Sequence, residues 1–185
     1  LFFLCLCITV NMVKWQWSDF MIVLGIDPGI AIMGYGILNY DNRNTHVLDY
    51  GTVTTPAGMP VQSRLRDIYK GVDTLIKTFN PDCAAIEELF YFKNKKTIIT
   101  VSEARGTTIT ACANNDIKVY EYTPLQVKQA VVGYGNAEKK QVQFMVRALL
   151  NLKEIPQPDD IADALAVGIC HCNSLNARRR GAYSD

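Results

Sequence analysis

Two short apolar runs in this chain each end in an acidic residue, and this pattern limits how the chain can fold. Residues 21–27 read M-I-V-L-G-I-D and end at Asp27, while residues 83–87 read C-A-A-I-E and end at Glu87. Both runs have the length and composition of strands buried on both faces. A carboxylate is costly to desolvate there unless a cation or hydrogen bonds compensate its charge. The fold must therefore bring both strand ends to a site where that compensation is available.

A second acidic pattern opens a helix further along the sequence. Residues 159–169 read D-D-I-A-D-A-L-A-V-G-I, in which Asp160 and Asp163 stand three positions apart. Residues at this spacing share one face of a helix, with Cβ atoms about 5–6 Å apart. Two strand ends and one helix face can together place all four carboxylates around a single point.

The four acids Asp27, Glu87, Asp160 and Asp163 predict a site for hard divalent cations. Carboxylate oxygens without a neighbouring set of Cys or His ligands favour Mg²⁺ or Mn²⁺. Two such ions, about 3.5–4 Å apart, are commonly used for in-line hydrolysis of phosphodiesters. The residues alone therefore favour a metal-dependent nuclease.

Each acidic site also offers a neighbouring acid. Glu88 follows Glu87, and Asp159 precedes Asp160. Alternation along a strand should turn residue 88 away from residue 87, and helical spacing should turn residue 159 away from the face shared by 160 and 163. Asp159 is instead a candidate cap for the helix N-terminus.

The hydrophobic pattern predicts an α/β fold. We expect strands at residues 21–27, 34–40, 46–55, 83–87 and 117–122, and helices at 60–80, 97–115, 137–150 and 159–173. A further helix should begin at Pro124, with Thr123 as its N-cap. Three antiparallel strands followed by parallel strands give a mixed five-stranded sheet flanked by helices. This order is compatible with a ribonuclease H-like architecture, in which the first strand is central and the fourth lies beside it.

Length and composition indicate one globular domain with a further segment at each end. The chain has 185 residues, 49% of them apolar and 20% charged, and its net charge of +1 says nothing about partners. We expect residues 21–174 to form the nuclease domain and 175–185, with Arg178–Arg180, to be a flexible basic tail. The apolar start of residues 1–20 is too short to span a bilayer, so we interpret this segment as an extension upstream of a natural start at Met21. The cysteine spacings favour free thiols, which suits a reducing cytoplasm.

Six collinear motifs make the chain similar to a known family. They are G-I-D-P-G-x-x-x-x-G-Y-G from Gly25, A-I-E-E-L-F from Ala85, A-R-G from Ala104, Q-V-K-Q-x-V-V-G-Y-G from Gln126, A-E-K-K-Q-V-Q from Ala137 and D-x-x-D-A-L-A from Asp160. Together they extend over almost the whole of residues 21–173. In this combination they resemble the RuvC family of bacterial Holliday-junction resolvases.

The resemblance implies roles for individual residues. The family's four metal-binding carboxylates fall on Asp27, Glu87, Asp160 and Asp163, with two Mg²⁺ ions in each subunit for which Mn²⁺ can substitute. Phe90 matches an aromatic residue that stacks on an unpaired base, and stacking of this kind contributes about 1–3 kcal/mol. Two lysines, Lys128 and Lys139, match basic positions that contact DNA phosphates.

The resemblance also implies a substrate and partners. The substrate is four-way junction DNA, nicked symmetrically on two strands of like polarity during recombination and repair, which leaves 5′-phosphate ends. The enzyme is a cytoplasmic homodimer that acts beside the RuvA–RuvB branch-migration complex, with no membrane association. The apolar residues Ile98, Ile99 and Val101 near the start of the second expected helix are candidates for the dimer surface.

Three other interpretations share part of this pattern. A sugar-kinase or actin-like ATPase also has an Asp and several glycines after its first strand, but the chain is too short for its two duplicated subdomains. A non-catalytic junction-binding module would not need all four carboxylates. A related ribonuclease H-like nuclease could act on RNA–DNA hybrids, ribosomal RNA precursors or another structured nucleic acid.

Overall fold

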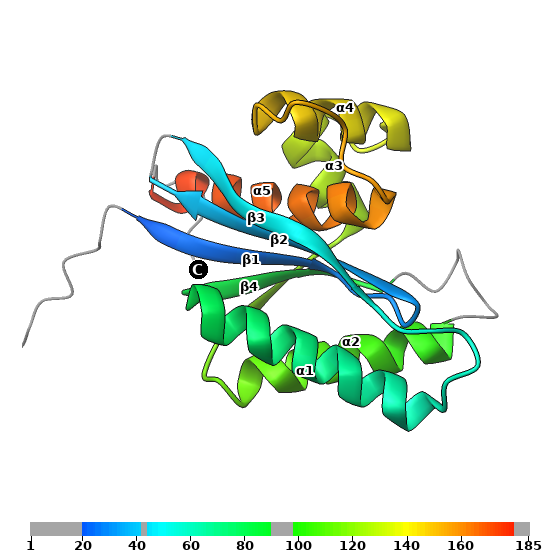
Figure 1. The fold of residues 1–185 in the computed structure, drawn as a ribbon. Helices are drawn as coiled ribbons and strands as arrows, with labels where there is room; N and C mark the ends of the chain where they lie inside the picture. The colour runs from blue at the N-terminus through cyan, green and yellow to red at the C-terminus, as the bar shows by residue number, and fades with distance from the viewer. Residues whose placement is uncertain (1–19, 42–43, 90–97, 180–185) are drawn as a thin grey trace, which may run out of the picture.

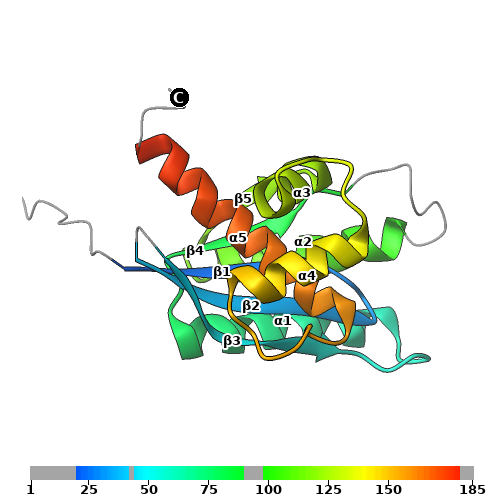
Figure 2. The same cartoon turned by 90° about the horizontal axis from the view of Figure 1, so that it is seen from above.

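In the computed structural model, which describes residues 20–41, 44–89 and 98–179, a sheet lies between two sets of helices (Figure 1). Helices α1 and α2 cover one face of the sheet, and α5 lies on the other face with α3 and α4 packed over it (Figure 2). The elements are β1 (Met21–Asp27), β2 (Ile32–Tyr40), β3 (Thr45–Thr54), α1 (Val61–Phe79), β4 (Cys83–Glu87), α2 (Ile98–Ala113), β5 (Lys118–Tyr122), α3 (Pro124–Val132), α4 (Lys139–Leu149) and α5 (Asp159–Arg179).

The strand order of the sheet is β3-β2-β1-β4-β5. The β1–β2 and β2–β3 pairs are antiparallel, and the β1–β4 and β4–β5 pairs are parallel. The expected mixed five-stranded sheet, with the first strand central and the fourth beside it, is therefore confirmed. In the parallel register Ile26 pairs with Ile86, so Asp27 and Glu87 lie at neighbouring ends of adjacent strands.

Helix α5 packs directly on the backbone of β1 and β2. A Cβ atom added to Gly34 would lie 2.0 Å from the carbonyl oxygen of Asp160, and one added to Gly25 would lie 2.3 Å from that of Ala164. Real Cβ atoms essentially never come this close to another heavy atom, because van der Waals repulsion prevents it. The two glycines thus let the N-terminal half of α5 approach the end of β1.

A buried polar cluster joins α5 to the half of the sheet formed by β4 and β5. The imidazole of His171, which is 1% exposed, lies with Nδ1 2.7 Å from the hydroxyl of Tyr122 and Nε2 3.2 Å from Sγ of Cys83. The Tyr122 hydroxyl is also 2.9 Å from Oγ of Ser174. Because Cys83 begins β4 and Tyr122 ends β5, these contacts fix the helix against both parallel strands.

The last helix is longer than its sequence pattern predicts. We expected it to end near residue 173 and a flexible tail to begin at 175, but α5 continues to Arg179. No Gly or Pro interrupts residues 170–179, Leu175 packs against the core, and the Tyr40 hydroxyl hydrogen-bonds Oδ1 of Asn176. These contacts extend the helix past the expected boundary.

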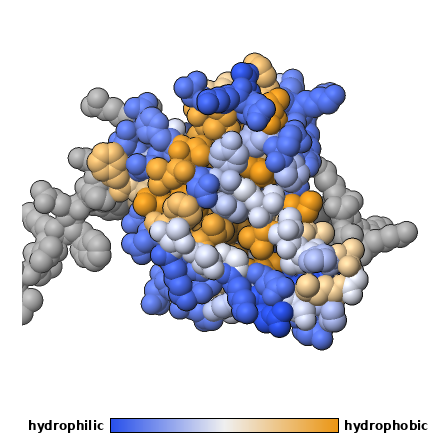
Figure 3. Space-filling model, viewed as in Figure 1, coloured by the Kyte–Doolittle hydropathy of each residue, from blue (hydrophilic) through white to orange (hydrophobic). Residues whose placement is uncertain are grey.

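The surface mixes polar helix faces with a more apolar band. Figure 3 shows apolar side chains gathered where the sheet lies between the helix layers, with polar side chains along α1 below. On β3, the strand at one edge of the sheet, Leu48 and Tyr50 are 49% and 39% exposed. No helix within the described ranges combines the length and apolar character needed to cross a membrane.

Replacing the glycine beneath α5 should destabilise the fold. Gly34→Ala would force α5 away from β2, and overpacking of this kind costs about 1–3 kcal/mol. The matched control is Gly106→Ala in α2, where an added Cβ meets nothing within 4 Å. Alanine there should stabilise the helix by about 0.5–1 kcal/mol. Urea unfolding of both variants measures the difference, and a Gly34→Ala protein as stable as the unchanged chain would contradict the close contact.

Candidate active site

The ends of β1 and β4 and the first turns of α5 surround a hollow of about 490 Å³. Its lining includes all four acids identified in the sequence: Asp27 from β1, Glu87 from β4, and Asp160 and Asp163 from α5. The fold therefore places all four of these carboxylates on the lining of one hollow.

The charges in this hollow oppose one another. Burial raises the pKa of Asp27 well above its ordinary value, and the nearby carboxylates of Asp163, Glu87 and Asp160 raise it further. Burial also raises the pKa of Asp163, against an opposing effect of Lys139. The hollow thus holds a concentration of negative charge that the described protein groups only partly compensate.

Lys139, the first residue of α4, supplies a positive charge. Its Nζ lies 2.8 Å from Oδ2 of Asp163 and forms a second ion pair with Asp159. Burial alone would lower the pKa of Lys139, but hydrogen bonds and charge interactions with the two aspartates raise it overall. The same ammonium lowers the pKa of Asp159. In this arrangement Lys139 acts as the counterion of the acids on α5.

The two neighbouring acids behave differently from each other. Asp159 pairs with Lys139, and backbone N–H groups of the first turn of α5 also lower the pKa of its carboxyl. This is close to the capping role expected of it, although Asp159 is itself the first helical residue. Glu88 lines the hollow together with Glu87, contrary to the expected alternation, because β4 ends at Glu87 and the strand pattern stops there.

The opposite wall of the hollow comes from α3 and α4. Thr123 caps α3 as expected, since its hydroxyl accepts a hydrogen bond from the backbone N–H of Gln126 at 3.2 Å. This helix places Lys128, for which the resemblance implies a phosphate contact, on the lining of the hollow. Phe90, the expected stacking residue, lies outside the described residues, and its neighbour Leu89 lines the hollow and is 37% exposed.

Two apolar residues of the lining were not expected at the acidic site. Val101 of α2, a candidate for the dimer surface, also borders the hollow. Val142 of α4 also borders it and was not singled out, although it stands three positions after Lys139 and therefore shares a helix face with it. The place of Val101 could not be predicted in the same way, because no repeating pattern in the sequence shows that α2 lies near the ends of β1 and β4.

The donor chemistry of the hollow fits a divalent cation. Its acidic lining offers only oxygen ligands, the set preferred by Mg²⁺ and Mn²⁺. A cation would also compensate the buried charge of Asp27. The acids do not form a closed cage, because within residues 20–41, 44–89 and 98–179 no three Asp, Glu, His or Cys side chains are already placed to hold one ion. Lys139 is the cation that pairs with Asp163 in this arrangement.

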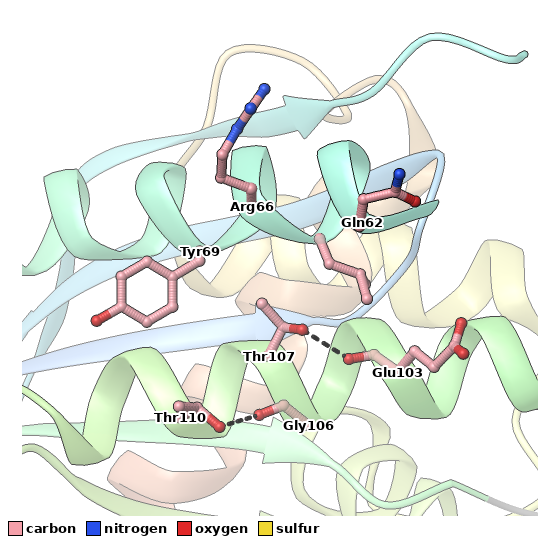
Figure 4. A pocket seen from close by; sticks show the side chains of 8 residues that line it. Gln62, Arg66, Tyr69, Glu103, Gly106, Thr107 and Thr110 are labelled. Atoms are coloured by element: carbon pink, nitrogen blue, oxygen red, sulfur yellow. Dashed lines mark hydrogen bonds between the residues drawn. The ribbon is translucent and has the colours of Figure 1, made fainter. Parts of the chain in front are cut away.

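A larger hollow of about 590 Å³ lies between α1 and α2, away from these acids (Figure 4). Two threonines of its lining donate hydrogen bonds to their own helix: Thr107 to the carbonyl of Glu103 at 2.9 Å and Thr110 to that of Gly106 at 2.8 Å. Their hydroxyls are thus already engaged, and we assign no chemistry to this hollow despite its size.

Comparisons with known proteins agree with the geometry. A family model described as Crossover junction endodeoxyribonuclease RuvC matches residues 23–171. A relative with the same description from Caldanaerobacter subterraneus is 60% identical, over 88% of this chain and 99% of the relative. One from Clostridioides difficile is 62% identical, over 83% of this chain and 91% of the relative.

Solved structures give the same result. The structure described as Thermus thermophilus RuvC in complex with Holliday junction substrate superposes with a TM-score of 0.81 at 35% identity, over 85% of this chain and 96% of that one. Sequence and structure together show that this chain belongs to the RuvC family, the crossover junction endodeoxyribonucleases.

Proposed function

We propose that this chain cleaves four-way DNA junctions, with Asp27, Glu87, Asp160 and Asp163 as the carboxylates that bind the metal. The observation that carries the proposal is the convergence of these four acids on one hollow, in which the buried Asp27 has a strongly raised pKa. Family membership implies dependence on a divalent metal in general. Mg²⁺, two ions in each subunit, and substitution by Mn²⁺ are the specific expectations.

The reaction is hydrolysis of a phosphodiester without a covalent enzyme intermediate. Bound divalent cations would favour deprotonation of the attacking water and stabilise charge on the leaving 3′-oxygen, which leaves a 5′-phosphate. The carboxylates of Asp27 and Asp163 supply the charge that holds such cations. Burial raises the pKa of Cys83 to about 12 and that of Cys112 to about 11, so these thiols are poor nucleophiles.

The basic residues of the hollow are suited to the DNA backbone. Lys128 lines the hollow from α3, and Lys139 is 53% exposed although it pairs with two aspartates. When a divalent cation compensates Asp163, the Lys139 ammonium becomes available to a phosphate oxygen. Phe90, three positions after Glu87 in the sequence, is our candidate for stacking on an unpaired base at the junction.

The substrate and assembly follow from symmetry. The Thermus relative is described in complex with a Holliday junction, which supports the same substrate here. Resolving a junction needs two nicks on strands of like polarity, and a homodimer with twofold symmetry places two identical sites against two related strands. Ile99, 71% exposed near the start of α2, is a candidate for the dimer surface. A cytoplasmic location, and action beside the RuvA–RuvB complex, complete the proposal.

The first prediction concerns catalysis. Asp27→Asn should keep the fold and junction binding but lose nicking in Mg²⁺, because an amide is a poor ligand for a hard cation. Gel assays should compare a four-way junction, an RNA–DNA hybrid and a plain duplex as substrates. Unchanged nicking by Asp27→Asn would exclude the metal assignment, and preferential cleavage of the hybrid would favour the related ribonuclease H-like alternative.

The second prediction concerns stability and pH. The pKa of Asp27 is raised above its ordinary value of 3.8, so its protonated form is the one that favours folding. Its contribution is full below that ordinary pKa and is lost as the pH rises through the folded-state pKa. In EDTA at pH 7, Asp27→Asn should therefore raise the unfolding temperature, with about 2–4 °C expected for each 1 kcal/mol at this chain length.

Metal removal provides the control for this stability effect. Mg²⁺ should raise the unfolding temperature of the unchanged chain more than that of Asp27→Asn, since binding to the folded state alone stabilises it. An Asp27→Asn protein that is less stable than the unchanged chain in EDTA would show that the Asp27 charge is already compensated within the protein.

The third prediction separates phosphate contacts from ordinary surface charge. Lys128→Ala and Lys139→Ala should each flatten the dependence of log affinity on log salt concentration by about 0.9, because one fewer counterion is released. Lys77→Ala, at an exposed ion pair with Asp73 on α1, is the control and should leave the slope unchanged. Equal slopes for all variants would identify Lys128 and Lys139 as residues without phosphate contacts.

The fourth prediction concerns assembly. Dimers of one unchanged chain and one Asp27→Asn chain should nick one strand and then stall, because each subunit would serve one strand. Counting single and double nicks on a covalently closed junction measures this directly. Paired nicks from mixed dimers, or a monomer in light scattering with and without DNA, would contradict the symmetric model.

A further inference from the structure

Arg64, in the first turn of α1, binds the turn that follows Asp27. Its Nη2 donates to the carbonyl of Ile30 at 3.1 Å, and its Nε donates to the hydroxyl of Thr55 at 2.7 Å. The Thr55 hydroxyl in turn donates to the same Ile30 carbonyl at 2.5 Å, and its backbone N–H donates to the carbonyl of Ala31 at 3.0 Å. One guanidinium and one hydroxyl thus connect α1, the segment after β3 and the β1–β2 turn.

The turn held in this way is part of the acidic hollow. Pro28 and Gly29 line the hollow beside Asp27, and the turn lies between the two strands rather than within their ladder. A Cβ atom on Gly29 would lie 1.9 Å from the carbonyl oxygen of Ile32, so the backbone folds tightly back on itself. The contacts from Arg64 and Thr55 hold this turn at the carbonyls of Ile30 and Ala31.

The environment of Arg64 indicates a structural use of its charge. Among the described residues no carboxylate forms an ion pair with it, and it donates hydrogen bonds to two carbonyls and a hydroxyl. Thr55 is only 5% exposed, so these bonds are formed where water competes weakly. A guanidinium used like this fixes a backbone shape, which a lysine with its single ammonium cannot reproduce.

We propose that Arg64 and Thr55 are positioning residues that hold the Asp27 carboxylate and the Pro28–Gly29 lining in the geometry needed to bind metal. The proposal rests on the function proposed above, since it assigns Asp27 to the metal. Neither residue is among those that line the acidic hollow. They act through the turn, as outer partners of metal ligands do, and loss of such partners commonly costs about 10–100-fold in metal affinity or activity.

The test compares variants that differ in one hydrogen-bonding group. Thr55→Val removes the hydroxyl but keeps the branched shape of the side chain, and Thr55→Ser keeps the hydroxyl. Arg64→Lys keeps the positive charge but loses the two guanidinium donors, Nε and Nη2. Lys77→Ala on the same helix is the control. Four readouts apply to each protein: Mn²⁺ affinity by calorimetry without DNA, the Mg²⁺ concentration for half-maximal nicking, junction affinity in EDTA, and hydrogen exchange of residues 29–31.

Thr55→Val and Arg64→Lys should each weaken Mn²⁺ binding and raise the Mg²⁺ midpoint by at least about tenfold. Hydrogen exchange at residues 29–31 should become faster, and junction affinity in EDTA should stay within about twofold. A general loss of stability would instead weaken metal binding and DNA binding together. Thr55→Ser should resemble the unchanged chain. If Arg64→Lys does not fold, the two Thr55 variants still decide the question.

Two results would overturn the proposal: a folded Thr55→Val protein with unchanged exchange and Mn²⁺ affinity, or a Thr55→Ser protein as impaired as Thr55→Val. Failure of the unchanged chain to bind Mn²⁺ or to nick junctions would instead reject the proposed function. In that case faster exchange at residues 29–31 in Thr55→Val would still establish the contact that holds the turn, and unchanged exchange would reject it.

Discussion

The contact between α5 and the bare backbone of β1 and β2 is the constraint on which the acidic hollow depends. Where a side chain would normally separate helix from sheet, Gly25 and Gly34 leave room for the helix backbone itself. Asp160 and Asp163 are therefore carried to the end of β1 at a depth that no larger residue at these glycines would permit. The His171 cluster fixes the same helix to β4 and β5, the other two strands of the parallel half of the sheet. The shape of the acidic hollow thus depends on packing between α5 and the sheet.

The arrangement that suits cation binding opposes folding. Burial and mutual repulsion raise the pKa of Asp27, which means that its ionised form is unfavourable in the folded chain. Lys139 reduces this repulsion from a neighbouring helix and is itself half-exposed. Because solvent already reaches the Lys139 ammonium, this arrangement is compatible with the proposal that a divalent cation replaces it as the partner of Asp163.

Much of the fold could be predicted from the sequence because local patterns determine it. Apolar runs that end in Asp27 and Glu87 mark strands, and the spacing of Asp160 and Asp163 marks one helix face, so the four acids could be identified before their distances were known. The end of α5 could not be predicted, because Leu175 and Asn176 are kept helical by contacts with the distant core and Tyr40. The place of Glu88 and Val101 in the hollow, and the bonds from Arg64 to Ile30, also depend on tertiary contacts that no local period records.

The order of the elements along the chain has a consequence for biosynthesis. The acidic hollow needs β1, the first of the described elements, and α5, the last of them. A ribosome makes the chain from the N-terminus, at about 5–20 residues per second, so Asp27 emerges well before the helix that completes the hollow. A nascent chain without α5 has Asp27 and Glu87 at the ends of β1 and β4 but lacks Asp160 and Asp163. Under the proposed assignment, the metal site therefore cannot form until α5 has been made.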